Sequence, residues 1–316
     1  MTEVERLSNQ QDGQAFYAKK GDSERTASEK RAISSFPKSI DVNPTAKCNL
    51  ACEFCWGPDH NIADGLNTNQ WKNAIQLFAQ NGTDSIVFTG GEPLIRSDIG
   101  ELVRFAKDQG MRVTLSTNTL LLKRKASQVL PFIDEIGVPL DGSTKENNSI
   151  MRVGNTRAFQ SSVEAMDLLS TGYPEIEVTV RTVVSKVNRD DIKNIGKLLE
   201  GKEGQFDRWK LYQFAPVSIG SHHKDKFEIS QEEFESIAKM ITDQFPKLPI
   251  VAYPSHQRVG RYVFLGPEGN IFGVDDTEDY RIVGNLKDIN EQNYQYMLER
   301  IYANDKNNMH AHLTKV

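Results

Sequence analysis

The sequence lacks long apolar runs and any excess of basic residues. No stretch of the 316 residues approaches the roughly 20 consecutive apolar residues of a membrane-spanning helix, and residues 1–10 lack the apolar centre of a secretory signal. Lys and Arg number 38 against 43 Asp and Glu, a net charge of −5. Non-specific nucleic-acid binding depends on a surplus of Lys and Arg, so we expect no generic nucleic-acid binding. From the missing apolar segments we expect a cytoplasmic protein without membrane association.

Cysteine is also scarce, and its placement is informative. Cys48, Cys52 and Cys55 are the only cysteines of the chain. A secreted protein of this size would spread an even number along its length, so the cluster indicates a metal centre in a reducing compartment. A structural zinc site would need a fourth ligand such as His60, and an ordinary ferredoxin cluster needs a fourth cysteine. Three thiols without a fourth therefore indicate an iron–sulfur cluster with one open metal position, and an iron–sulfur electron carrier or a zinc-stabilised binding module is the non-enzyme alternative.

Apolar periodicity divides the chain into three parts. Residues 1–38 are polar and predict a flexible extension, residues 39–214 alternate between strand and helix patterns, and residues 215–316 predict a C-terminal α+β extension covering the barrel mouth. Strand patterns occupy 39–44, 84–90, 112–118, 134–142, 175–184 and 207–214, followed by short strands at 261–266 and 270–274. Helix starts are predicted near Thr68, Asp98, Thr156, Asn188 or Asp190, and Ser230, and further helices are predicted at 122–132 and around 291–303.

Six strands separated by helices predict an α/β fold with a parallel sheet and right-handed crossovers. Six units are fewer than the eight of a closed barrel, so an open, partial (β/α)6 barrel or a doubly wound sheet would fit. In both folds the chemistry lies at the carboxyl ends of the strands. Unusual residues follow the first four strands there, namely Cys48 to Cys55, Gly90 to Pro93, Ser116 to Asn118, and Asp141.

Two of these segments form a recognisable pair. The motif Cys48-x3-Cys52-x2-Cys55 followed by Trp56, with Gly90-Gly91-Glu92-Pro93 after the second strand, resembles the radical S-adenosylmethionine (SAM) superfamily over about residues 39–214. The resemblance implies the partial (β/α)6 barrel. It also implies one 4Fe–4S cluster, with Cys48, Cys52 and Cys55 on three irons and SAM on the fourth. An electron from a flavodoxin- or ferredoxin-like partner would then cleave SAM, and the 5′-deoxyadenosyl radical would remove a hydrogen atom from a substrate.

The resemblance also implies contacts to SAM. Trp56 would flank the adenine, and Gly90, Gly91, Glu92 and Pro93 would bind the methionine amino group, with Glu92 as its carboxylate partner. Ser116 and Asn118 would reach the ribose or the carboxylate, and Arg181 would clamp the carboxylate. Structural alternatives remain, because Trp56 could be core, Asn118 or Asp141 could close a turn, and Arg152 could form a surface ion pair.

The substrate is predicted from the rest of the chain. No cysteine follows Cys55, which excludes the auxiliary clusters of many peptide-modifying relatives, and residues 1–38 are too few for a leader-binding domain. The layout after residue 208 is instead similar to cluster-poor members such as the nucleotide-dehydrating viperin group. His222, His223, Lys224, Lys226, Arg258 and Arg261 could form a phosphate-recognising lid or a solvated loop. We expect a small nucleoside-, nucleotide- or sugar-like substrate, with a peptide (RiPP-type) substrate as the alternative.

Overall fold

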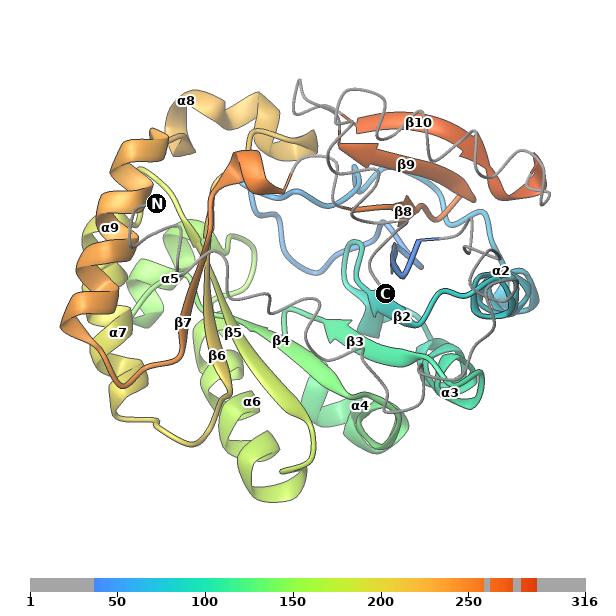
Figure 1. Cartoon of the computed structure of the whole chain (residues 1–316), viewed down its shortest axis with the longest axis horizontal. Coiled ribbons are helices and arrows are strands. Elements are labelled where there is room, and N and C mark those ends of the chain that lie inside the picture. The colour runs from blue at the N-terminus through green and yellow to red at the C-terminus, as the bar shows by residue number, and fades with distance from the viewer. Residues whose placement is uncertain (1–36, 259–261, 275–279, 289–316) are drawn as a thin grey trace, which may run out of the picture.

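One curved sheet is the framework of the molecule. The computed structural model describes residues 37–258, 262–274 and 280–288. Within them, ten strands follow one another across the sheet in the order β10-β9-β8-β1-β2-β3-β4-β5-β6-β7. Strands β8, β1 and β2 to β7 are paired in parallel, whereas β9 is antiparallel to both β8 and β10. The sheet curves around an inner face, and most helices lie on its outer side (Figure 1).

The elements have the following bounds. The strands are β1 (Ser39–Val42), β2 (Ser85–Phe88), β3 (Arg112–Ser116), β4 (Glu135–Pro139), β5 (Glu177–Val184), β6 (Arg208–Gln213), β7 (Ile250–Tyr253), β8 (Phe264–Leu265), β9 (Asn270–Val274) and β10 (Tyr280–Asn285). The α-helices are α2 (Thr68–Gln80), α3 (Ile99–Asp108), α4 (Leu122–Val129), α5 (Lys145–Met151), α6 (Ala158–Gly172), α7 (Ile192–Glu200), α8 (Lys224–Phe227) and α9 (Gln231–Gln244). Each of the six strands predicted over 39–214 contains one observed strand, and the expected open α/β architecture is confirmed.

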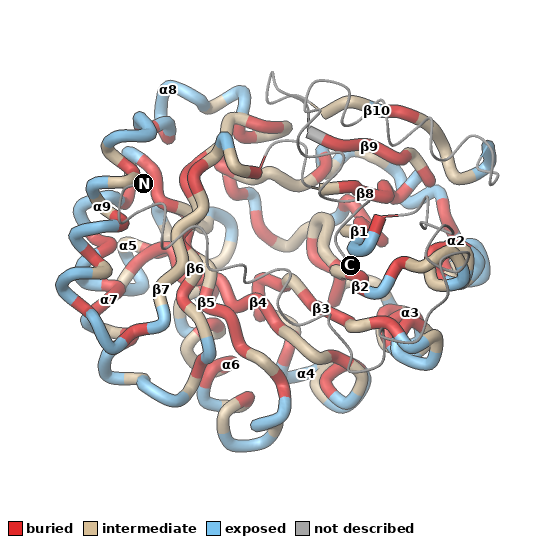
Figure 2. Tube along the Cα trace, in the orientation of Figure 1, coloured by how far each residue is buried: buried red, intermediate tan, exposed pale blue. Residues whose placement is uncertain are grey.

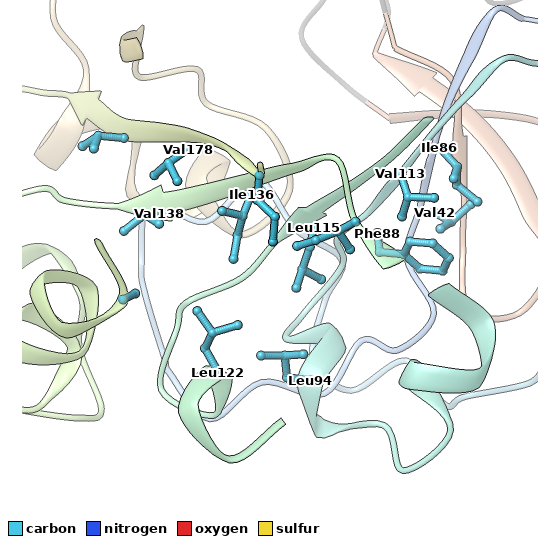
Figure 3. Packing of buried hydrophobic residues seen from close by; sticks show 14 of the residues in the cluster. Val42, Ile86, Phe88, Leu94, Val113, Leu115, Leu122, Ile136, Val138 and Val178 are labelled. Atoms are coloured by element: carbon cyan, nitrogen blue, oxygen red, sulfur yellow. The ribbon is translucent and has the colours of Figure 1, made fainter. Parts of the chain in front are cut away.

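The main core lies between the sheet and the outer helices. Alternate residues of a strand point to opposite faces, and the outward residues are apolar and buried. They include Val42, Ile86, Phe88, Val113, Leu115, Ile136, Val138 and Val178, which lie with Leu94 and Leu122 in one cluster (Figure 3). Burial follows the same division, with strands mostly buried and the outer sides of the helices exposed (Figure 2). Removing this apolar surface from water is the main force that holds helices and sheet together.

The helix starts differ from the predicted ones in detail. Asn67, rather than Thr68, caps α2, because its side chain accepts from the Gln70 backbone N–H (3.0 Å) and the Gln70 side chain accepts from the Asn67 backbone N–H (2.9 Å). Asp98 precedes α3 without capping it, because its carboxylate binds Arg96 instead. The predicted Ser230 cap of α9 is confirmed.

Strands beyond residue 214 extend the same sheet at both of its sides. The sequence patterns did not indicate β7, which pairs in parallel with β6, or α5, whose seven residues are mostly polar. Strand β8 pairs in parallel with β1, so residues 264–265 lie next to the first strand of the sheet. The division at 38/39 and 214/215 stays a prediction, and the helix predicted at 291–303 lies outside the described residues. Within the described ranges, no helix is long and apolar enough to cross a membrane.

Candidate active site

The three cysteines lie in the loop that joins β1 to α2, at the carboxyl end of β1. Cys52 is buried, Cys48 and Cys55 are half-buried, and all three are free of disulfides. Two backbone hydrogen bonds tie this cysteine loop to the segment after β2. The Gly91 N–H donates to the Thr45 carbonyl (2.9 Å), and the Glu92 N–H donates to the Lys47 carbonyl (2.8 Å). The first two strand ends therefore meet, as the order of the motifs predicts.

Two of the sulfur atoms accept hydrogen bonds from backbone N–H groups. The Leu50 N–H donates to Cys48 Sγ (3.4 Å), and the Gly57 N–H donates to Cys55 Sγ (3.2 Å). These bonds favour the thiolate, which is the form that ligates metals. Burial opposes them and raises the pKa of all three thiols, that of Cys52 to about 12. Because a metal deprotonates the thiols that coordinate it, this loop is suited to a bound metal centre rather than to free reactive thiols.

The donor set fits a cluster better than a single ion. No three His, Cys, Asp or Glu side chains in the described ranges are grouped so that they could hold one metal ion. His60, the fourth ligand that a zinc site would require, therefore does not complete such a group. Three thiols and no closed fourth position match a cluster that leaves one metal position open.

Two glycines allow the strand ends to approach each other. A Cβ atom on Gly91 would lie 2.2 Å from the Lys47 carbonyl oxygen, and one on Gly90 would lie 2.6 Å from the Thr45 carbonyl oxygen. Gly90 also has a φ of +111°, a conformation that side chains disfavour. The glycine pair is therefore required for packing the segment 90–93 against the cysteine loop.

Glu92 joins the ends of β2 and β3. Its carboxylate is fully buried and accepts three hydrogen bonds, from the Leu94 N–H (3.0 Å), the Thr117 hydroxyl (2.7 Å) and the Asn118 N–H (2.7 Å). Burial raises the pKa of Glu92 to about 6, and these hydrogen bonds limit the rise. Three of about four acceptor positions are thus used by the protein. The observed role of Glu92 is to anchor the loop, and its contact with the SAM amino group stays a prediction.

Asn118 links the end of β3 to the cysteine loop. Its side-chain N–H group donates to the Asn49 side chain (2.6 Å) and lies 3.8 Å from Cys48 Sγ, while its oxygen accepts from the Leu120 N–H (3.1 Å). Asn118 therefore does close the turn after β3, and it also contacts the metal-binding loop. Asn49 carries no sequence signal of its own and becomes a site residue only through this contact.

Ser116 and Arg181 meet on the inner face of the sheet. The Arg181 guanidinium donates to Ser116 Oγ (3.1 Å), to Thr179 Oγ1 (3.3 Å) and to Glu135 Oε1 (3.4 Å). It occupies the space over Gly137, where a Cβ atom would lie 2.4 Å from the guanidinium carbon. Arg181 is thus already paired inside the protein, and a clamp on the SAM carboxylate stays a prediction.

Asp141 and Arg152 form a buried ion pair below the cysteine loop. Asp141 is fully buried and accepts from Arg152 Nε (2.6 Å) and from the Val183 N–H (2.7 Å). The positive charge of Arg152 lowers the pKa of all three cysteines, against the larger effect of burial. The expectation of a surface ion pair for Arg152 is therefore wrong, because α5 folds back and brings its end against the loop.

Trp56 begins a row of aromatic and cationic side chains that leads to the inner face. The Arg258 guanidinium lies over the Trp56 ring at 4.8 Å and over the Tyr212 ring at 5.5 Å, and Tyr212 stacks on Tyr253 at 5.1 Å. The Trp56 ring also meets Tyr262 edge-on at 5.6 Å. Its indole N–H is buried and has no hydrogen-bond partner, an unusual state that a ligand acceptor would relieve.

Several basic side chains of the predicted lid are ion-paired or buried. Lys226 is paired with Glu53, and Lys224 lies 3.3 Å from Glu228. Arg258 is 6% exposed and belongs to the aromatic row, not to a lid. His222 lines a cavity of about 640 Å³ together with residues 59–61, Ser218, Ile219 and Ser221. His223 lies in the same 3-10 turn (Ser218–His223), and Arg261 lies outside the described residues.

Fold and site together define a class of enzyme. The sequence model of the radical SAM superfamily matches residues 42–199, and the chain belongs to this superfamily, whose members are enzymes that use a 4Fe–4S cluster and SAM.

Individual relatives differ in what they act on. The chain is 25% identical over 256 residues to an S-adenosylmethionine-dependent nucleotide dehydratase of Selenomonas ruminantium, which covers 78% of this chain and 89% of that protein. It is 31% identical over 239 residues to an Fe-coproporphyrin III synthase of Methanosarcina barkeri, covering 74% of this chain but only 58% of the relative. Among solved structures, Streptococcus suis SuiB bound to the precursor peptide SuiA has a TM-score of 0.66 at 18% identity, over 78% of this chain and 61% of SuiB. That likeness concerns the fold.

Proposed function

We propose that the protein cleaves SAM reductively and removes a hydrogen atom from a small polar substrate of the nucleoside, nucleotide or sugar class. The observation that carries this proposal is a single connected site. The cysteine loop, the segment 90–93 and Asn118 are hydrogen-bonded to one another at the carboxyl ends of the strands. This site continues through the aromatic row onto the inner face, where a substrate would lie.

Each part of the site has a proposed role. Cys48, Cys52 and Cys55 would ligate the cluster, and the segment Gly90 to Pro93 would bind the amino group of SAM, with Glu92 as its carboxylate partner. Bound together, the cluster and SAM supply a 5′-deoxyadenosyl radical that takes a hydrogen atom from an unactivated carbon. The protein's task is then to hold that carbon close and to exclude water. Half-buried Trp56 and the aromatic row behind it would provide such an apolar wall.

The charges of the inner face support an anionic small substrate. Most charges of the inner face are paired with one another, since Arg112, Arg181, Arg208 and Lys210 form ion pairs with Glu135 and Glu177. Arg258 is a cation next to the cysteine loop, because it lies between the Trp56 and Tyr212 rings. A cation at this place favours an anionic ligand. The nucleotide dehydratase relative, matched over most of its length, points to the same substrate class.

A peptide substrate is the second candidate, and one observation favours it. Strand β10 ends the sheet in the described part of the chain and carries Ile282, which is 58% exposed. An exposed strand edge with an apolar side chain can bind an extended peptide by strand addition. The fold of the peptide-bound SuiB structure is similar. Under either proposal the electron would come from an external flavodoxin- or ferredoxin-like protein.

Substrate-stimulated cleavage of SAM tests the proposal. The reconstituted, iron-loaded chain would be incubated anaerobically with reductant, SAM and one candidate at a time, and 5′-deoxyadenosine would be measured. The panel contains nucleoside triphosphates, nucleosides, sugar phosphates and strand-forming peptides. We expect stimulation by a nucleotide or a sugar phosphate, with Cys52→Ala as the inactive control. Stimulation by peptides alone would replace the proposal with the peptide alternative.

A further inference from the structure

Asp41 carries a carboxyl group on the inner face of the sheet, and the proposed roles of the other site residues do not involve it. Its neighbours Ile40 and Val42 are buried in the core against the helices, so the Asp41 side chain points to the opposite, inner face. It is flanked by Val87 on β2 and Phe264 on β8, neither of which carries a polar side-chain group. The side chain is only partly accessible, and its carboxyl has no hydrogen-bond or ion-pair partner in the described ranges.

The other inner carboxyls show how unusual this is. Glu135 lies within 3.5 Å of the basic groups of Arg112, Arg181 and Lys210, and these charges hold its pKa down at about 2. Glu177 is paired with Arg112 and Arg208. Burial without a partner instead raises the pKa of Asp41 to about 7, and the more distant charge of Arg181 only moderates the rise. Two carboxyls with opposite shifts in one barrel indicate different tasks.

The titratable groups around Asp41 do not pair with it. The other titratable groups that sense its charge are the phenols of Tyr212 on β6, Tyr262 before β8, and Tyr280 on β10. None of them hydrogen-bonds to it. A buried acceptor without a donor costs free energy, and the described residues offer no donor that removes this cost. A hydrogen-bond donor of a substrate bound in the barrel would remove it.

We propose that Asp41 is a substrate-binding residue whose carboxylate accepts hydrogen bonds from two adjacent donors of the substrate. A carboxylate presents two oxygens side by side, which match a vicinal diol of a sugar or the neighbouring amino and imino groups of a base. Binding would release the carboxyl proton to solvent, because only the ionised form accepts both hydrogen bonds. This inference rests on the proposed function, since it places a polar small molecule on the inner face.

Nucleotide binding to the complete, cluster- and SAM-loaded chain tests this assignment. The probes are ATP, GTP, CTP and UTP with their 2′-deoxy and 3′-deoxy forms, measured by titration calorimetry at pH 6, 7 and 8. The variants are Asp41→Asn, of nearly equal size, and Asp84→Asn as a control. Asp84 is an exposed carboxyl whose ion-pair partner is Lys38. Iron content and SAM affinity are matched before comparison.

The expected result has three parts. Asp41→Asn weakens the best nucleotide by about ten- to a hundredfold, the scale of a lost charge-assisted hydrogen bond, while Asp84→Asn does not. Wild-type affinity rises from pH 6 to pH 8 more steeply than that of Asp41→Asn, and the difference between the two slopes reports Asp41, because the triphosphate itself titrates in this range. If Asp41 binds the ribose diol, wild type binds the deoxynucleotides as weakly as Asp41→Asn binds the ribonucleotide. If Asp41 binds a base edge, wild type binds the deoxynucleotides normally, and the affinity that Asp41→Asn loses depends on the base.

The experiment distinguishes a wrong role for Asp41 from a wrong substrate class. Equal affinities for wild type and Asp41→Asn would overturn the assignment of Asp41 and leave the nucleotide proposal standing. If no nucleotide binds wild type, the nucleotide proposal fails, and the probe becomes whichever compound stimulates 5′-deoxyadenosine formation. An unchanged KM of Asp41→Asn for that compound would overturn the assignment, and a tenfold rise would support it.

Discussion

Replacing Asp41 with Asn should stabilise the ligand-free fold, by an amount that grows as the pH rises from about 4 to about 7. In the unfolded chain the carboxyl has an ordinary pKa of 3.8, whereas in the folded chain the pKa is about 7. Each pKa unit corresponds to about 1.4 kcal/mol, so ionised Asp41 would cost the fold at most about 4 kcal/mol. Because part of the side chain reaches solvent, we expect about 2–4 kcal/mol. A substrate-binding residue that weakens the empty protein is a known trade of stability for function.

The sign follows from proton linkage. The folded pKa lies above the unfolded one, so the wild type has its full stability below pH 4 and loses it as the pH rises to 7. Asn does not titrate, so the advantage of the variant grows with pH over that range and is constant above it. Between pH 5.5 and 8 the difference in unfolding free energy should increase by about 2 kcal/mol.

Urea unfolding of the SAM-free, iron-loaded protein under anaerobic conditions measures this difference. The same titration with Asp84→Asn should show no comparable pH-dependent gain, because that carboxyl is exposed. A difference between wild type and Asp41→Asn that is equal at pH 5.5 and pH 8 would refute the reasoning. A variant that is less stable than wild type at every pH would also refute the reasoning. It would mean that the Asp41 carboxyl makes a stabilising contact in the wild type.

Three further predictions concern the cysteine loop. Cys52→Ala should lose cluster iron to background, with a far-ultraviolet circular dichroism spectrum like that of wild type; retained iron and SAM cleavage would disprove the ligand assignment. Gly91→Ala should destabilise the protein by about 1–3 kcal/mol or more, because its Cβ meets the Lys47 carbonyl at 2.2 Å, whereas Gly172→Ala meets no atom within 4 Å and should be nearly neutral in thermal unfolding. Arg152→Met should cost about 3–5 kcal/mol by leaving Asp141 buried and unpaired, and the double variant with Asp141→Asn should recover part of that loss; an additive double variant would contradict the pairing.

Much of the fold could be predicted because its sequence signals are local. The strands β1 to β6 alternate with amphipathic helices, and each helix carries its apolar face in its own sequence. Strand β7 is no shorter than β1 or β2, but its four residues show no alternation of apolar and polar side chains, and all four are only half-buried. Helix α5 has few apolar residues, although Thr144, whose side chain accepts from the Asn147 N–H, is a capping signal that could have indicated it.

The site was predictable where the chain order brings strand ends together, and not where distant side chains meet. Cys48, the glycine pair and Asn118 follow consecutive strands, so the parallel sheet places them side by side. The ion pair of Arg152 with Asp141 depends on how α5 returns to the loop, which no spacing reveals. Asp41 had a usable signal, because a carboxyl between two outward apolar residues of a strand must point inward.

Transfer of deuterium from substrate to 5′-deoxyadenosine tests the central claim most directly. The compound that most stimulates SAM cleavage would be prepared with deuterium on its carbon-bound positions and incubated with the reduced, cluster-loaded protein. Mass spectrometry of the 5′-deoxyadenosine then reports whether the hydrogen atom came from that compound. We predict one deuterium from a nucleotide or sugar phosphate, and no label with Cys52→Ala. Label from a peptide, with none from any nucleotide or sugar, would contradict the account.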